Sequence, residues 1–373
     1  MHCKICCWLL LTCWFAGCGF NTHRDGDAGQ KMEEVALSYA TQFTLKKQGG
    51  NYLLTVFTDA RHSAEASQTF TLVSDTTGKR GDHDHVIPIP CRRIVCVSST
   101  QLAYFFALKD IDNIVGINSS RYLFHEEMNR RVANGEVKRI GKEGNFNLEL
   151  VAALNPDVIF VSPYKAGGYD ALKNMGIPLV PVAAYNEMTP LGRAEWIKMM
   201  ALFVDKTREA DSIFAAIEQR YNELKDRVAG VKHRPTVFSG KLRSGAWYVP
   251  GGASFFARFF RDAGAQYVID DDEQRAYPVG FETIYQKAHD ADFWRVVNPE
   301  KKGISLEEFL AQDVRYADFK AAAEGNIFLC NIREKPYYEQ AAVKPDVILA
   351  DYIHFFHPQL LPDYEPFFYE KLK

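Results

Sequence analysis

The sequence has few of the features that would indicate a nucleic-acid partner, a disulfide framework or a zinc site. Its 44 Lys and Arg residues against 47 Asp and Glu residues give a net charge of −3, and no basic block offers the footprint that nucleic acid binding requires. No Cys and His spacing typical of a zinc site is present. Cys91 and Cys96 flank one strand-like run, which disfavours a disulfide between them. Five of the eight cysteines lie within the first 18 residues, at positions Cys3, Cys6, Cys7, Cys13 and Cys18.

The apolar stretch at residues 5–17 follows a basic start and is too short to span a bilayer as a mature helix. It ends in Phe15-Ala16-Gly17-Cys18, and small residues before a cysteine resemble the lipobox of bacterial lipoproteins. This layout predicts a signal peptide at residues 1–17, lipid attachment at Cys18 and a flexible polar tether at residues 18–30. Two alternatives stay open: a secreted chain cleaved without lipid, and an ordinary buried apolar N-terminus. With the lipid, the protein is expected to face the periplasm or to sit on the cell surface.

Short alternating stretches at residues 43–47, 52–58 and 69–74 are separated by glycine, asparagine and polar residues. This period-two pattern predicts a small antiparallel β-meander. The meander occupies residues 31–90 in the predicted division of the chain.

From residue 93 the pattern changes to short apolar strands that alternate with helices, which is typical of a parallel α/β sheet. The pattern fills residues 91–204 and returns in residues 231–373. The sequence therefore predicts an α/β fold of two Rossmann-like lobes, each with a mostly parallel sheet. The expected elements include helices at 148–154 and 281–288 and strands at 158–161 and 236–239.

One long helix is predicted between the two lobes, over residues 205–230. Its apolar residues recur every three or four positions from Ala210 to Val228, Asp205 is the expected N-cap, and Gly230 follows. At 1.5 Å per residue it spans roughly 35 Å, about the width of one domain. A helix of this kind makes the pair of lobes stiff, so the cleft between them is expected to be largely preformed.

Three segments carry a resemblance to a known family. Residues 93–117, RIVCVSSTQLAYFFALKDIDNIVGI, resemble the opening of the helix-linked (class III) substrate-binding proteins of ABC importers, the family that binds cobalamin, iron siderophores and haem. Residues 147–161, NLELVAALNPDVIFV, are similar to its helix–strand signature, and residues 281–288, FETIYQKA, to the matching helix of the second lobe. The segment 345–362 also fits the end of such proteins, whereas the meander lies outside the resemblance.

The resemblance implies a lipid-anchored substrate-binding protein rather than an enzyme. It would capture a metal chelate (ferric siderophore, haem or cobalamin) in the interlobe cleft and deliver it to an ABC transporter permease dimer with its ATPase. A monomer without a resident cofactor or metal is expected.

The resemblance also implies a docking role for two glutamates. Glu149 and Glu282 stand near the starts of matching helices, and in the family one glutamate on each lobe pairs with arginines of the permease. Two separated acidic points would orient a two-lobed protein on a two-fold partner. The alternative is stabilisation of each helix N-terminus by a negative charge, and both roles are compatible.

The loops at the carboxyl ends of the strands, where ligands bind in open α/β lobes, are rich in aromatic residues and arginines. Such residues suit a bulky or flat ligand with carboxylate or phosphate groups. Core packing is the alternative for rings such as Trp294, and Gly251-Gly252 after the pair Trp247-Tyr248 could equally be a tight connection. The predicted ligand contacts are Ser99, Tyr122, Tyr164, Tyr185, Arg243, Trp247, Tyr248, Arg275, Tyr277, Trp294 and Arg333.

Two other functions compete with this interpretation. Capture of a free metal ion needs His, Asp or Glu residues that converge from both lobes; His125, His289, His354 and His357 are available, but the last two belong to a terminal helix. An exported hydrolase would need a catalytic motif, and the sequence contains neither a Gly-x-Ser-x-Gly elbow nor a His-Glu-x-x-His helix.

Overall fold

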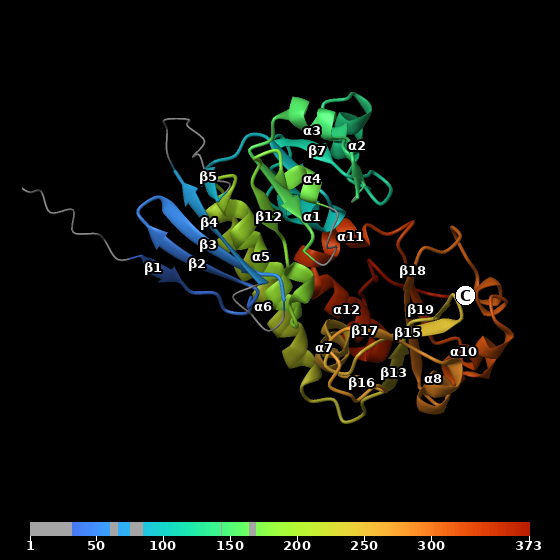
Figure 1. Ribbon diagram of the computed structural model, residues 1–373. Coiled ribbons are helices and arrows are strands. Elements are labelled where there is room, and N and C mark those ends of the chain that lie inside the picture. The colour runs from blue at the N-terminus through green and yellow to red at the C-terminus, as the bar shows by residue number, and fades with distance from the viewer. Residues whose placement is uncertain (1–31, 60–65, 75–84, 143, 164–168) are drawn as a thin grey trace, which may run out of the picture.

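The computed structural model describes residues 32–59, 66–74, 85–142, 144–163 and 169–373. An N-terminal sheet is followed by two α/β lobes with a long helix between them (Figure 1). The predicted signal peptide, the lipidation site Cys18 and the tether lie outside the described residues.

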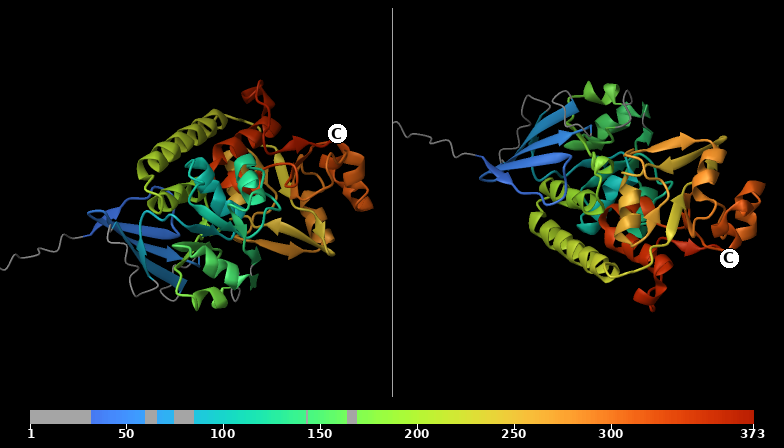
Figure 2. Two further views of the ribbon diagram at one scale, coloured as in Figure 1. Left: turned by 90° about the horizontal axis from the view of Figure 1, so that it is seen from above. Right: turned by 90° about the horizontal axis from the view of Figure 1, so that it is seen from below.

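The N-terminal sheet lies against two helices, α5 (Pro190–Leu202) and α6 (Thr207–Val228), as both views of Figure 2 show. The ring centre of Phe43 is 4.8 Å from that of Trp196 on α5, and the ring centre of Tyr39 is 6.0 Å from that of Phe214 on α6. The predicted meander is present, extended by a first strand and by a last strand that pairs in parallel with its neighbour. In sheet order the strands are β1 (Glu33–Val35), β2 (Phe43–Gln48), β3 (Asn51–Phe57), β4 (Ser67–Val73) and β5 (Val86–Pro88).

The first lobe contains β6 (Ile94–Cys96), α1 (Ser99–Ala107), β7 (Ile114–Ile117), α2 (Glu126–Ala133), β8 (Lys138–Arg139), β9 (Gly141–Lys142), β10 (Asn145–Phe146), α3 (Leu148–Leu154), β11 (Val158–Val161), α4 (Asp170–Lys173), β12 (Leu179–Pro181), the 3-10 turn η2 (Ala184–Asn186) and α5. Its parallel sheet has the strand order β12-β11-β6-β7-β8. Side chains of β6 and of Val97, which follows it, alternate between two buried clusters, Ile94 and Cys96 in one and Val95 and Val97 in the other, because helices cover both faces. The Ser98 hydroxyl accepts a hydrogen bond from the Thr100 N–H, so α1 begins directly at the carboxyl end of β6.

Helix α6 connects the lobes as predicted, although its start differs. Asp205 has a φ of 54°, in the left-handed region, and the helix begins only after Lys206. Asp205 is therefore a turn residue and the prediction that it caps the helix is wrong. The buried face of α6 includes Phe214, Ile217 and Tyr221.

The second lobe contains β13 (Thr236–Ser239), β14 (Leu242–Arg243), β15 (Ala246–Pro250), α7 (Phe255–Asp262), β16 (Gln266–Tyr267), β17 (Ala276–Val279), α8 (Phe281–Ala288), β18 (Phe293–Asn298), α9 (Leu306–Leu310), η3 (Val314–Asp318), α10 (Lys320–Ala323), β19 (Ile327–Asn331) and β20 (Glu370–Lys371). The main sheet has the order β16-β13-β18-β19-β20, in which only β20 is antiparallel. A smaller antiparallel sheet has the order β14-β15-β17.

The C-terminal helices form a second connection between the lobes. Elements α11 (Tyr337–Gln340), η4 (Ala341–Val343), α12 (Pro345–Phe356) and η5 (Pro358–Leu360) follow β19, and the first three return to pack against helices α1, α5 and α6 (Figure 1). The helical stretch from residue 341 to residue 356 is divided before Pro345, because proline occupies the first turn of a helix and cannot continue one.

Within the described ranges, no helix combines the length and the apolar character needed to cross a bilayer. Cys91, Cys96 and Cys330 are buried free thiols.

Candidate functional site

A cavity of about 210 Å³ lies between the two lobes. The start of α1, the η2 loop after β12 and the first turns of α5 line it from the first lobe. The start of α7 and the elements α11, η4 and α12 line it from the second lobe. The lining residues are Thr100, Tyr185, Arg193, Phe255, Phe256, Tyr337, Tyr338, Ala341, Ala342 and Ile348.

Arg193 is the charged residue of this cavity lining. Its Nε donates to the Ala184 carbonyl and its Nη2 to the Tyr185 carbonyl, each at 3.1 Å. Among the described residues, no carboxylate lies within 4.0 Å of its guanidinium. Burial lowers the pKa of Arg193, although the nearby Tyr337, Tyr104 and Glu187 oppose that effect. Because this guanidinium keeps spare N–H groups and contacts no carboxylate of the described residues, it is suited to an anion in the cavity.

The two phenylalanines at the start of α7 each face an arginine. The guanidinium carbon of Arg193 is 3.6 Å from the ring centre of Phe255, and that of Arg295 is 4.1 Å from the ring centre of Phe256. Arg295 is buried on β18 and donates to hydroxyl groups, among them Tyr369 at 2.8 Å and Ser239 at 3.2 Å. A positive charge therefore lies against each ring: Arg193, which lines the cavity, against Phe255, and Arg295 against Phe256.

At the rim of the cavity, Tyr122 of the first lobe meets Tyr338 of α11, with ring centres 5.5 Å apart. The loop that carries Tyr122 is held by the buried Glu339, whose Oε2 accepts the N–H of Phe124 at 2.7 Å and of His125 at 3.3 Å. Burial raises the pKa of Glu339, and these two N–H groups work against the rise. The rim is thus a contact between lobes held by one buried carboxylate.

Several predicted ligand residues lie at this cavity. Tyr185 lines it, Ser99 precedes the lining residue Thr100, and Tyr122 stands at its rim. Tyr164 lies outside the described residues.

Trp247 and Trp294 were predicted as ligand contacts, and that prediction is wrong. Both are fully buried in the second lobe, with ring centres 5.4 Å apart. Their indole N–H groups donate to backbone carbonyls, Trp247 to Ser239 at 3.0 Å and Trp294 to Gly240 at 2.8 Å. No ligand reaches such rings, because they form the core beneath the β14-β15-β17 sheet.

The other predicted residues of the second lobe are accessible but dispersed. Tyr248 is 47% exposed on β15, and Arg243 is exposed on the neighbouring β14. The Tyr277 hydroxyl donates to Asp271, and burial together with that carboxylate raises the pKa of Tyr277 to about 12. Arg275 reaches across to the first lobe, where its Nη2 lies 3.4 Å from the Asn186 Oδ1. Arg333 is exposed just after β19.

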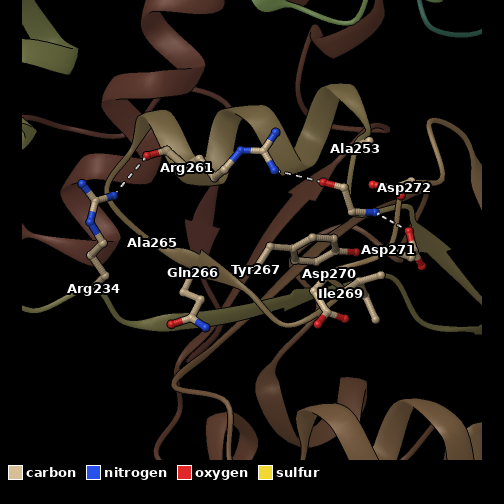
Figure 3. Close-up of a pocket in the computed structure, with 11 residues that line it drawn as sticks. Arg234, Ala253, Arg261, Ala265, Gln266, Tyr267, Ile269, Asp270, Asp271 and Asp272 are labelled. Carbon is tan, nitrogen blue, oxygen red and sulfur yellow. Dashed lines mark hydrogen bonds between the residues drawn. The ribbon is translucent and has the colours of Figure 1, made fainter.

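A larger cavity of about 600 Å³ lies on the second lobe alone, along the edge strand β16 (Figure 3). Its charged groups serve the local backbone: Arg261 donates to the Gly252 carbonyl at 3.0 Å, and Asp271 accepts the Gly252 N–H at 2.8 Å. Arg234 donates to the Arg261 carbonyl in the same way. No described residue of the first lobe lines this cavity, so the interlobe cavity is the stronger candidate for a ligand site.

In the described part of the chain, no group of three or more His, Cys, Asp or Glu residues is placed to hold a metal ion. His125 caps helix α2, with its Nδ1 accepting the Met128 N–H at 3.3 Å, and its ring stacks on Phe106. His357 is buried against the Gly264 carbonyl.

The two glutamates predicted to dock a partner are exposed. Glu149 is in the first turn of α3 and Glu282 in the first turn of α8, so each lobe presents one of them. Leu148, beside Glu149, is also 38% exposed.

Sequence reasoning missed Arg193, Phe255 and Phe256. No sequence signal singled out Arg193, because α5 also carries Glu195 and Lys198 and only tertiary packing decides which charged residue faces the other lobe. The two phenylalanines were not singled out, because nothing local shows that the first turn of α7 faces the other lobe.

Comparison with known proteins agrees with this architecture. A family model described as "Periplasmic binding protein" matches residues 94–334. An uncharacterised lipoprotein of Methanocaldococcus jannaschii is 29% identical over 307 residues, which cover 79% of this chain and 72% of that relative.

Solved structures share the fold at low sequence identity. A periplasmic haem-binding protein from Pseudomonas aeruginosa superposes with a TM-score of 0.60 at 17% identity, covering 76% of this chain and 98% of that one. A periplasmic molybdate-binding protein from Haemophilus influenzae, with molybdate bound, gives 0.59 at 18% identity, covering 75% and 90%. At such identities the likeness establishes the two-lobed fold.

Proposed function

The chain belongs to the periplasmic binding protein family, and on that premise we propose that it is the substrate-binding lipoprotein of an ABC importer for an anionic metal chelate. The ligand would be a ferric siderophore with acidic groups or haem, captured between the lobes and delivered to a permease dimer with its ATPase. Relatives that carry the word lipoprotein in their names support the anchor at Cys18. The boundaries 91–204, 205–230 and 231–373 remain the proposed division of the chain.

The observation that carries the proposal is the position of Arg193. Its guanidinium lies at the boundary of the lobes, stacked on Phe255, with no carboxylate within ion-pair distance among the described residues. An unpaired charge is costly to hold away from water unless a ligand completes its partners. A carboxylate, catecholate or phosphate group in the cavity would do so with charge-assisted hydrogen bonds.

The aromatic lining adds a preference for a flat group. Tyr185, Phe255, Phe256, Tyr337 and Tyr338 surround the cavity with ring faces and edges. The volume of about 210 Å³ lies below the roughly 300 Å³ of a site for a whole drug-sized ligand. One part of a siderophore or one edge of haem would enter the cavity, and the rest of the chelate would lie outside it.

Isothermal titration calorimetry tests the ligand class directly. The purified protein is titrated with ferric haem, an acidic ferric siderophore, cobalamin and ferric ion alone. Binding of haem or of the siderophore that depends on Arg193 supports the proposal. Stoichiometric binding of the bare ion, or of cobalamin alone, contradicts it.

A small oxyanion is the second candidate, because the cavity itself is small and holds a guanidinium. The structural relative solved with molybdate bound makes this anion the natural probe. Molybdate joins the same titration series, and tight molybdate binding without chelate binding would favour this second function.

A further inference from the structure

The N-terminal sheet precedes the residues matched by the family model, yet it is bonded to the loop that lines the cavity. Two buried carboxylates of the first lobe, Glu187 and Glu195, collect the backbone N–H groups of five consecutive residues, 38–42. We refer to residues 38–42 as the arm. Carboxylates that accept several backbone N–H groups form strong, charge-assisted contacts.

Glu195 holds the first half of the arm. Its Oε1 accepts the Ser38 N–H at 3.0 Å, and its Oε2 accepts those of Tyr39 at 2.7 Å and Ala40 at 2.8 Å. Lys198 donates to the same carboxylate at 2.8 Å. Glu195 lies within helix α5, two positions beyond Arg193, and does not line the cavity.

Glu187 holds the second half and belongs to the cavity loop. It accepts the N–H groups of Thr41 and Gln42 at 3.0 Å and the Trp196 indole N–H at 2.8 Å. It directly follows η2, the turn that carries the cavity residue Tyr185. On the cavity side, the Tyr185 carbonyl accepts from Arg193.

A second bond joins the sheet to the same turn. The Asn186 Nδ2 donates to the Thr58 carbonyl at 3.1 Å, just beyond strand β3, while its Oδ1 faces Arg275 of the second lobe. The packing between arm and lobe is close: a side chain on Gly192 would place its Cβ 2.9 Å from the Tyr39 carbonyl and 3.1 Å from the Glu187 Oε2. The turn η2 and Glu187 after it are thus held by the N-terminal sheet and the arm on one side, and by Arg193 on the cavity side.

We infer that the N-terminal sheet positions the ligand loop, and that Glu187 is the positioning residue that holds Tyr185 in the cavity by way of the arm. The inference rests on the proposed function, in which Tyr185 and Arg193 meet the ligand. A loop held in its binding conformation loses less entropy when the ligand arrives, so affinity depends on the support behind it. Without Glu187, the N–H groups of Thr41, Gln42 and Trp196 lose this acceptor, and the turn η2 loses its contact with the arm.

The test compares Glu187→Gln with Glu195→Gln. Both variants remove one buried carboxylate that binds the arm, but only Glu187 belongs to the cavity loop, so Glu195→Gln controls for loss of the arm contact itself. Two measurements are made on the full chain: hydrogen–deuterium exchange of peptides covering 38–44 and 182–188, and ferric haem affinity by calorimetry well below both unfolding midpoints.

The expected result is faster exchange of the 38–44 peptide in both variants. Only Glu187→Gln should speed exchange of the 182–188 peptide and weaken haem binding, by about tenfold. Equal loop exchange in the two variants, or unchanged loop exchange in Glu187→Gln, would overturn the inference.

Two additions to the experiment cover a variant that does not fold and a wild-type protein that does not bind haem. If Glu187→Gln does not fold, Asn186→Ala, which removes only the Thr58 bond, should show the same loop exchange in milder form, and its absence would count against the inference. The hydrogen–deuterium exchange measurement does not require a bound ligand. A wild-type protein that fails to bind haem therefore weakens the proposed function, whereas the exchange comparison still decides the role of the arm.

Discussion

The guanidinium carbon of Arg193 lies 3.6 Å from the ring centre of Phe255, and the two residues come from different lobes. The arginine is further held by the Ala184 and Tyr185 carbonyls, which are neutral acceptors. A cation–π contact and two such hydrogen bonds fix the position of the charge without neutralising it. The stack therefore presents a positive group at the junction of the lobes, where a ligand can contact both.

Removal of this charge should weaken anionic ligands. Arg193→Ala is expected to reduce affinity for haem or an acidic ferric siderophore by the roughly 1.5–3 kcal/mol of a hydrogen bond to a charged group, about ten- to a hundredfold. Arg193→Lys keeps the charge but loses the planar stack on Phe255, so its affinity should lie between those of the wild type and Arg193→Ala. Calorimetric titration measures both.

The control for this series is Arg227→Ala, which removes an exposed arginine from helix α6 away from the cavity. Its affinity should equal that of the wild type. Equal losses in Arg193→Ala and Arg227→Ala would show that net charge, and not the cavity, attracts the ligand.

The neighbouring residues Trp247 and Tyr248 should differ strongly in their contribution to stability. Trp247 is fully buried among aromatic rings, whereas Tyr248 is 47% exposed on the opposite face of β15. Trp247→Ala should lower the free energy of unfolding by about 3–5 kcal/mol, as for other large core deletions. Tyr248→Ala should leave that free energy within about 0.5 kcal/mol of the wild type, as for most surface changes. Urea unfolding gives both values, and a destabilised Tyr248→Ala would contradict the assignment of faces.

Local elements could be predicted well from the sequence. The helices Leu148–Leu154 and Phe281–Ala288 and the strands Val158–Val161 and Thr236–Ser239 have the predicted bounds. Their signals are local: a capping residue such as Asn147, an apolar run, or a proline or glycine at the boundary. The two-lobed α/β fold follows from the order of such elements.

The cavity could not be predicted in the same way, because its residues meet only through tertiary packing. Gln42 and Glu187, which join the arm to the cavity loop, are 145 positions apart. Trp247 was misassigned because a loop-like segment, Trp247-Tyr248, is in fact part of strand β15, and Trp294 was misassigned because it lies inside the buried strand β18 and not in a loop at a strand end. The alternation of strand β15 buries one ring and exposes the next. An aromatic residue near a strand end carries no local sign of which face it occupies.

Acidification should destabilise the protein through His357. Burial lowers the pKa of His357, the Gly264 carbonyl opposes this, and the nearby Arg234 and His233 lower it further. The unfolded chain has the ordinary histidine pKa near 6.5 and takes up the proton first, so stability falls as the pH drops below about 6.5. The variant His357→Gln, which retains an N–H donor toward Gly264, should show a weaker loss of stability between about pH 7 and 5.

Urea unfolding of the two proteins across this range provides the measurement. The comparison must be between wild type and variant, because the raised pKa of Glu339 makes that group titrate in the opposite sense and add stability on acidification. Parallel pH profiles for the two proteins would exclude His357 as the source of the acid sensitivity.

Charge reversal at the two exposed glutamates should separate docking from ligand capture. In Glu149→Lys with Glu282→Lys, ligand affinity should stay at the wild-type value, because neither residue lines the interlobe cavity. Uptake of the chelate by cells that carry the complete transporter should be abolished, because two like charges would face the arginines expected on the permease. The matched control reverses Glu126 and Glu307, which are also exposed glutamates in the first turn of a helix, one on each lobe. Since the helix-terminus contribution of about 0.3–1 kcal/mol is lost in both double variants, a loss of uptake confined to Glu149 and Glu282 assigns them to docking. Reduced affinity with intact uptake would refute that role.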